Sequence, residues 1–118
     1  MPHSSEKTPA EVVQEQVDAY NARDIEAFLA TYAEDIEVFD HPDTLTMSGH
    51  VQMREIYAGL FDRIPDLNAA ITNRITIGKF VIDQEKVTGL PDNRTLDAVA
   101  IYEVDDCKIR RVWFVKDS

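Results

Sequence analysis

The chain has 118 residues, of which 44% are apolar and 29% are charged, and these values are typical of one globular domain with a sizeable core. Its formal net charge is −10, with 12 lysines and arginines against 22 acidic residues, so binding to the phosphates of a nucleic acid is not expected. No apolar run approaches the roughly 20 residues that a membrane-spanning helix needs. The first residues lack the basic stretch and apolar core of a signal peptide, and we therefore expect a cytoplasmic protein.

The first elements along the chain are predicted to be helices. Residues 1–8 are expected to form a flexible N-terminus, and residues 9–118 a single domain. The segment Thr8-Pro9-Ala10-Glu11 matches a capping box with proline at the first helical position. Apolar residues then recur at helical spacing as far as Tyr20, with Gln16 on the same stripe. Asp24 can cap a second helix, which is predicted to extend to Tyr32.

A short strand is predicted over residues 36–40, where His41-Pro42 stops it. Residues 43–47 are expected to form either a loop or a second short strand. A third helix is predicted to begin at Ser48-Gly49 and to end at Pro65. Its apolar stripe is the clearest in the chain and contains Met53, Ile56, Tyr57, Leu60, Phe61 and Ile64.

Four strands are predicted in the remainder, over residues 67–77, 80–88, 94–104 and 108–116. In the first of them the odd positions form an apolar face on which Asn73 is the polar exception. In the second, Asp83 and Glu85 share one face, and whether this face points to a cavity or to solvent is left open, with solvent favoured because exposed acids are the norm. Helices followed by strands predict an α+β fold with the helices packed on one face of a mainly antiparallel sheet.

The last two predicted strands are apolar on both faces. A sheet with one solvated face does not need this pattern, and we therefore expect a homodimer that covers the outer face of the sheet. No metal site is predicted, because the three histidines have neither a histidine partner at helical spacing nor an acidic ligand pair of the usual kind nearby. No cofactor is expected.

Several segments together indicate a family. Nearly the whole chain, from about Pro9 to Val115, resembles the SnoaL-like and ketosteroid-isomerase-like families of the nuclear transport factor 2-like superfamily. The resemblance is carried by residues 12–24, 32–40, 48–49, 53–57 and 107–114. It implies a cone-shaped fold, in which a curved sheet and three N-terminal helices enclose a pocket for a small, largely apolar molecule. The superfamily includes isomerases, polyketide cyclases, dehydratases, epoxide hydrolases and proteins that only bind.

The resemblance also implies roles for individual residues. Asp40 falls where the isomerases keep their general base, and an apolar cavity would raise the pKa of a carboxyl group toward neutrality. The tyrosine and the protonated aspartate that stabilise the oxyanion in those isomerases correspond to Gln16 and Val99, while Asp97 lies two residues before Val99. These departures argue against steroid isomerisation itself. The Arg-x-Asp pairing of the limonene epoxide hydrolases is not found.

The sequence thus predicts a cofactor-independent enzyme of the isomerase, cyclase or dehydratase type. Asp40 would shuttle a proton on a small, largely apolar carbonyl compound, and Gln16, Asp97 and Asn73 would polarise the oxygen on which charge develops. Further binding residues are predicted to be Tyr20, Tyr57, Phe61, Val99 and Trp113. The alternative is a ligand-binding protein without catalysis, or a dimeric accessory or interaction module of the same fold.

Overall fold

The computed structural model describes residues 7–116. The predicted flexible N-terminus lies almost entirely outside these residues, as do the last two residues of the predicted domain. The described chain forms the helices α1 (Pro9–Ala22), α2 (Ile25–Ala30) and α3 (Gly49–Arg63), a short 3₁₀ helix at Pro91–Asn93, and the strands β1 (Tyr32–Asp40), β2 (Thr44–Ser48), β3 (Asn68–Ile77), β4 (Phe80–Thr88), β5 (Leu96–Asp105) and β6 (Lys108–Lys116).

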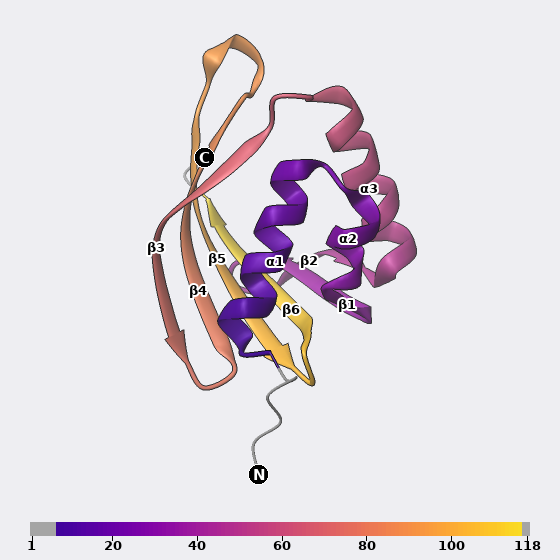
Figure 1. The fold of residues 1–118 in the computed structure, drawn as a ribbon, viewed down its shortest axis with the longest axis vertical. Coiled ribbons are helices and arrows are strands. Elements are labelled where there is room, and N and C mark those ends of the chain that lie inside the picture. The colour runs from indigo at the N-terminus through magenta and orange to yellow at the C-terminus, as the bar shows by residue number, and fades with distance from the viewer. Residues whose placement is uncertain (1–6, 117–118) are drawn as a thin grey trace.

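The six strands form one sheet in the order β2-β1-β6-β5-β4-β3. Strands β3 to β6 are an antiparallel meander, as predicted, whereas β1 pairs with β6 in parallel and with β2 antiparallel. The three helices lie on one side of this curved sheet, with α1 across β3 to β6 and α3 over β1 and β2 (Figure 1). The predicted α+β class is confirmed.

The ends of the first two helices follow from local hydrogen bonds. The Thr8 hydroxyl accepts a hydrogen bond from the backbone N–H of Glu11 at 3.2 Å, and the Glu11 carboxylate accepts one from the N–H of Thr8 at 2.8 Å. This confirms the predicted capping box. Asp24 caps α2 by accepting a hydrogen bond from the N–H of Ala27 at 3.1 Å.

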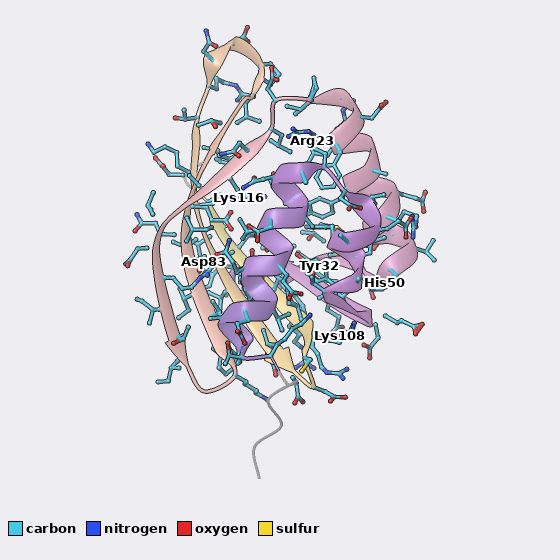
Figure 2. All side chains as sticks on the ribbon, viewed as in Figure 1. Arg23, Tyr32, His50, Asp83, Lys108 and Lys116 are labelled. Atoms are coloured by element: carbon cyan, nitrogen blue, oxygen red, sulfur yellow. The ribbon has the colours of Figure 1, made fainter. Side chains whose placement is uncertain are left out.

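The prediction that the second helix reaches Tyr32 is wrong. Helix α2 ends at Ala30, and both the backbone N–H and the hydroxyl of Thr31 donate hydrogen bonds to the carbonyl of Phe28. This interaction closes the last turn, so Tyr32 begins strand β1 and its buried side chain packs against Phe28 from the sheet side, with ring centroids 5.1 Å apart. Figure 2 shows Tyr32 beneath the helices.

The alternation of faces along β3 is interrupted by a β-bulge. Ile71 pairs with Glu85 and Asn73 pairs with Gln84, so Thr72 is an extra residue in the pairing register, and its hydroxyl donates a hydrogen bond to the Gln84 carbonyl at 3.3 Å. Since one extra residue exchanges the two faces of a strand, Arg74 points toward the helices. Asn73 is exposed on the outer face and does not line the cavity, so the structure does not place it as the binding residue that the sequence analysis predicted.

The outer face of the sheet carries a continuous line of apolar side chains. One residue from each strand is aligned with its neighbours in the pairing register, and we call this line the outer row: Leu45, Phe39, Trp113, Ile101, Ile82 and Ile75. The rings of Phe39 and Trp113 are stacked within it, with centroids 5.7 Å apart. Leu45 and Ile75 are 51% and 54% exposed. The sequence pattern of apolar residues on both faces of the last strands is thus present in the structure.

Candidate functional site

A cavity of about 380 Å³ lies between the helices and the inner face of the sheet. Helix α1 contributes Gln16, Val17 and Tyr20, helix α3 contributes Ile56, Tyr57 and Leu60, and most of the remaining wall comes from the strands. Ala69 and Ala98 form part of this wall on β3 and β5, and their short side chains leave space that a larger residue would fill. Most of the lining is apolar, which suits a largely apolar guest.

The structure brings together four of the residues predicted for the site. Gln16, Tyr20, Asp40 and Tyr57 all line the cavity. Tyr20 and Tyr57 approach it from two helices, and their rings meet edge to face with centroids 6.4 Å apart. Burial raises the pKa of both hydroxyls above the ordinary value of 10, and the charge of Glu85 adds to the rise. Both groups therefore stay protonated at neutral pH.

The other predicted site residues lie elsewhere. Phe61 is packed inside the aromatic cluster of the core against Phe28. Val99 is on the face of β5 opposite to Ala98, as is Asp97, whose exposed carboxylate lies 3.6 Å from the Lys86 ammonium. Trp113 belongs to the outer row and is likewise separated from the cavity by the sheet.

Asp40 occupies the mouth of the cavity. It ends strand β1, its side chain is 51% exposed, and one carboxylate oxygen lies 3.7 Å from the Lys116 ammonium. Lys116 also lines the cavity. The mouth therefore carries an ion pair in contact with solvent, and such a pair is held by only a weak net attraction.

Glu85 is a buried carboxyl group inside the cavity, and the sequence analysis did not include it among the site residues. It is 9% exposed, and its Oε2 accepts a hydrogen bond from the Tyr102 hydroxyl at 3.3 Å. Burial raises the pKa of Glu85 from 4.5 to about 7, and the nearby Asp83 charge adds to the rise, while the Tyr102 hydrogen bond and the Arg74 charge oppose it. Near neutral pH this carboxyl group can both accept and release a proton.

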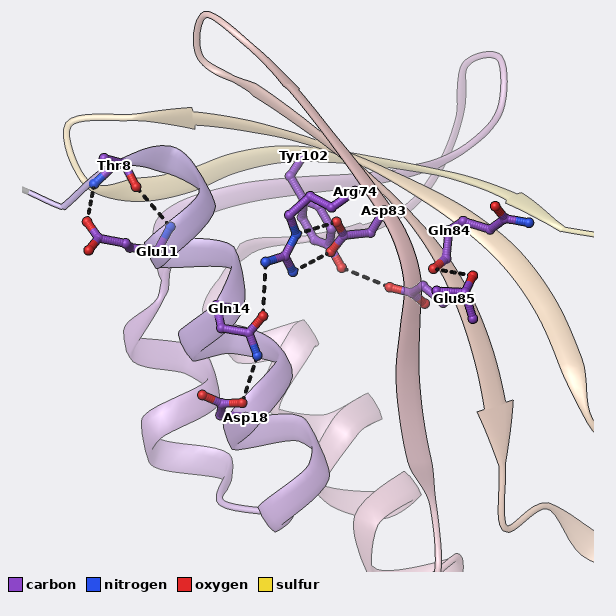
Figure 3. A network of polar contacts seen from close by, with 10 residues as sticks. Thr8, Glu11, Gln14, Asp18, Arg74, Asp83, Gln84, Glu85 and Tyr102 are labelled. Carbon is purple, nitrogen blue, oxygen red and sulfur yellow. Dashed lines mark hydrogen bonds and ion pairs between the residues drawn. The ribbon is translucent and has the colours of Figure 1, made fainter.

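Asp83 lies on the same face of β4 as Glu85, and its side chain has no exposed surface. It accepts two hydrogen bonds from Arg74, at 2.7 and 2.9 Å, and Arg74 donates a third to Gln14 of α1 at 2.9 Å (Figure 3). The expectation that the Asp83 and Glu85 face points to solvent is wrong. This face can be buried because the bulge in β3 directs Arg74 inward, where its positive charge pairs with the Asp83 carboxylate.

The apolar pattern of β4 was relevant to Glu85 but did not decide its burial. Val81 and Val87 flank the two acids on one face of β4, and both are buried. However, Phe80 and Ile82 on the opposite face are also apolar, so the pattern alone did not decide which face is inside. Choosing the inner face would have required knowing that Arg74 points inward, and this depends on the extra residue at Thr72.

Gln16 has an unusual polar environment. The residue is 6% exposed, lies in the cavity wall, and its Oε1 atom has no hydrogen-bond partner among the described residues. Its amide favours the ionised form of the Tyr32 hydroxyl, although burial still holds the pKa of Tyr32 well above 10.

Within residues 7–116 the structure contains no group of three or more histidine, cysteine, aspartate or glutamate side chains that could hold a metal ion. None of the helices in this described part is both long and apolar enough to cross a membrane.

Comparison with known proteins agrees with the geometry. The SnoaL-like domain family matches residues 13–112. An uncharacterized cystatin-fold protein from Novosphingobium aromaticivorans is 26% identical, with a TM-score of 0.85 over 92% of this chain and 98% of that chain. A candidate ketosteroid isomerase from Kribbella flavida is 21% identical, with a TM-score of 0.78 over 93% and 78%.

A third similar structure is a hypothetical protein with a ketosteroid isomerase-like fold from Catenulispora acidiphila, solved in complex with trimethylamine. It is 20% identical, with a TM-score of 0.75 over 92% of this chain and 85% of that chain. A search among curated proteins found no match. On the evidence of its sequence match and its architecture, the chain belongs to the SnoaL-like domain family and has the nuclear transport factor 2-like fold.

Proposed function

We propose that this protein binds a small, largely apolar molecule in its cavity and catalyses proton transfer on it, as an isomerase, cyclase or dehydratase does, with Glu85 as the group that takes up and returns the proton. The observation that carries the proposal is a buried carboxyl group, in an otherwise largely apolar cavity, whose pKa is raised to about 7. A general acid–base group is most effective when its pKa lies near the working pH.

The surroundings of Glu85 support this chemistry. When a carbonyl compound loses a proton from the adjacent carbon, negative charge develops on its oxygen, and hydrogen-bond donors stabilise that charge. Tyr20 and Tyr57 line the same cavity as protonated hydroxyls and can donate to such an oxygen. The structural relative solved with trimethylamine supports the proposal that this fold holds small molecules.

Asp40 remains the second candidate for the proton shuttle. It lines the cavity, but its position at the mouth and its pairing with Lys116 give it a more aqueous environment than that of Glu85. Glu85, in contrast, is buried within the cavity. We therefore assign the proton transfer to Glu85 and expect Asp40 to act at the mouth of the cavity.

The test is deuterium exchange at the acidic C1 position of 2-tetralone, followed by proton NMR in D₂O near neutrality. A carboxylate base removes a proton from C1 to give the enolate, the carboxyl proton exchanges with D₂O, and the deuterated carboxyl group returns deuterium to the same carbon. We expect the wild-type protein to accelerate exchange, Glu85→Gln to reduce the acceleration about 100-fold or more, and Asp40→Asn to retain most of it.

The matched pair of variants separates the two carboxyl groups, since each replaces a carboxylate by an amide of the same shape. Loss of exchange in Asp40→Asn with full exchange in Glu85→Gln would overturn the assignment and return the proton shuttle to Asp40. A carbon-13 NMR titration of Glu85 that gives an ordinary carboxyl pKa, together with no exchange by the wild type, would leave a binding protein without catalysis.

The outer row supports a second proposal, that the protein is a homodimer in which two copies cover this face. The row crosses all six strands, and its members at the sheet edges are more than half exposed. Contiguous apolar surface of this kind is typical of an interface between subunits. A dimeric accessory or interaction role would use the same surface.

A further inference from the structure

The two buried acids on the inner face of β4 differ in their partners. Asp83 accepts two hydrogen bonds from the Arg74 guanidinium. Glu85 forms no ion pair within residues 7–116, and its hydrogen-bond partner there is the neutral hydroxyl of Tyr102. An ionised carboxyl group in an apolar setting is costly unless a cation accompanies it. A cation that enters the cavity can supply the charge that the surroundings of Glu85 lack.

The carboxyl group of Glu85 can be reached by a guest. The residue retains 9% of its surface and lines the cavity. Tyr102 engages Oε2, whereas Oε1 is not among the buried side-chain atoms that lack a hydrogen bond, so Oε1 is accessible from the cavity. In the sheet, Glu85 lies opposite Ala98, which in turn lies opposite Lys116 at the mouth. Only the short side chain of Ala98 therefore separates the carboxyl group from the mouth along this row of the sheet.

The other charges around the cavity do not meet this need. Among the described residues Lys116 is the one lysine or arginine in the lining, and its ammonium already lies 3.7 Å from the Asp40 carboxylate. Arg74 is outside the lining and is bound to Asp83 and Gln14. The formal net charge of −10 raises the concentration of cations near the protein. The electrostatics therefore favour a cationic guest over an anionic one.

Aromatic rings also surround the carboxyl group. Tyr20, Tyr57, Tyr102 and Phe114 all line the cavity. The negative charge of Glu85 raises the pKa of the three tyrosine hydroxyls, so it acts on all of them. A cation is attracted to the face of an aromatic ring as well as to a carboxylate. The cavity thus offers a cation a counter-charge and aromatic surface, with apolar walls for the rest of the molecule.

We infer that the cavity binds apolar amines as their ammonium ions, with the ammonium against Glu85 Oε1 and the apolar body between the helices and the sheet. This goes beyond the proposed proton transfer, since it requires binding alone. One consequence rests on the proposed function: such amines are competitive inhibitors, because the ammonium occupies the carboxylate that takes up the proton of the substrate.

The test compares tetralin, 2-tetralol and 2-aminotetralin, which share one skeleton and differ in polarity and charge. Affinities are measured by NMR titration at pH 8, where an aliphatic amine is protonated, as lysine is with its pKa of about 10.4. We expect 2-aminotetralin to bind the wild type at least about 10-fold more tightly than 2-tetralol, with this preference lost in Glu85→Gln, which keeps the shape of the side chain without its charge. A preference lost in Asp40→Asn and kept in Glu85→Gln would place the ammonium at the mouth and overturn the inference.

The pH dependence gives a second measurement, which needs no variant. The titratable and charged groups around Glu85 come from all the elements that enclose it: Asp83 on β4, Arg74 on β3, Tyr102 on β5, Tyr20 on α1, Tyr57 on α3, Tyr32 and Asp40 on β1, and Lys116 on β6. No histidine of the described chain lines the cavity. With a pKa of about 7, the ionised fraction of Glu85 rises from about one-tenth at pH 6 to about nine-tenths at pH 8. The affinity for 2-aminotetralin should therefore rise about 5- to 10-fold between these pH values, and saturating amine should lower the midpoint of a carbon-13 titration of Glu85.

The outcomes separate this inference from the proposed function. Equal affinities of 2-aminotetralin and 2-tetralol for the wild type, or a Glu85 midpoint that the amine does not move, would overturn the amine site, and deuterium exchange of 2-tetralone would still support proton transfer. Tight, pH-dependent binding of the amine without any exchange of 2-tetralone would support the amine site and remove the proposed catalysis. Exchange that 2-aminotetralin inhibits competitively at pH 8 would support both.

Discussion

Arg74 and Asp83 form a two-bonded ion pair beneath helix α1, with nitrogen–oxygen distances of 2.7 and 2.9 Å. Asp83 has no exposed surface, and the Arg74 side chain is only 22% exposed. Asp83 is two residues from Glu85 on the same face of β4, so the pair influences the carboxyl group in the cavity. The Arg74 charge lowers the pKa of Glu85, and the Asp83 charge raises it.

Removing Arg74 should destabilise the protein strongly. In Arg74→Met the buried Asp83 carboxylate loses its counter-charge, and we expect a loss of about 3 kcal/mol in the free energy of unfolding at pH 7, measured by urea denaturation. The exposed Lys86–Asp97 pair provides the control, because Lys86→Met should change stability by no more than about 0.5 kcal/mol. Similar losses in the two variants would contradict the role of burial.

Glu85→Gln should be more stable than the wild type at high pH. Below pH 4.5 the carboxyl group is protonated in both the folded and the unfolded chain. Between pH 4.5 and 7 the unfolded chain ionises first, so wild-type stability falls, and the loss is complete above the folded pKa of about 7. This shift corresponds to about 3 kcal/mol. We expect the stability difference between variant and wild type to grow by that amount from pH 4 to pH 8, and parallel stability curves would contradict the raised pKa.

Ala98→Leu should block the cavity. Ala98 lies in the cavity wall directly opposite Glu85 on the neighbouring strand, and a leucine there fills free volume. We expect at least about 10-fold weaker binding of 2-tetralone with a stability change below about 1.5 kcal/mol. Ala100 provides the matched control on the same strand face, since it is fully buried opposite Asp83 and outside the cavity wall. Ala100→Leu should cost about 1–3 kcal/mol by overpacking, and equal costs at the two positions would show that no cavity exists at Ala98.

Ile101→Lys should convert the proposed dimer into monomers. Ile101 lies in the middle of the outer row, and a lysine ammonium cannot be buried there without a partner. Sedimentation equilibrium at micromolar concentration should give a dimer for the wild type and a folded monomer for this variant. Val51→Lys is the control, because Val51 is 77% exposed on α3, away from the outer row. A monomeric wild type would contradict the proposal.

Much of the fold could be predicted because its signals are local. The capping box at Thr8 and Glu11 and the cap at Asp24 depend on residues within one helical turn, and the structure has the same contacts. Turn residues and alternation likewise placed the four strands of the meander within two residues of their observed ends. Local chemistry was sufficient for the order and type of the longer elements, while residues 43–47 were left as either a loop or a strand.

The site could be predicted only in part, because it depends on which face of each strand is inside. Strands β5 and β6 are apolar on both faces, so Val99 and Trp113 fitted the inner side as well as the outer side. The correct choice follows from long-range contacts, such as the stacking of Trp113 on Phe39. Glu85 was missed for the same reason, since the burial of its strand face depends on Arg74, which comes from another strand and pairs with the neighbouring Asp83.

The bulge at Thr72 sets which charged side chains meet in the interior through strand pairing, and not through the threonine side chain. If the strand passed this point in strict alternation, Thr72 would pair with Gln84 and Asn73 with Asp83, so the guanidinium of Arg74 would turn to the outer face and leave Asp83 sealed without a cation. Replacing the exposed Thr72 by another residue would leave the observed arrangement in place. A slip of one residue in the pairing of β3 with β4 is therefore the change that the interior tolerates least.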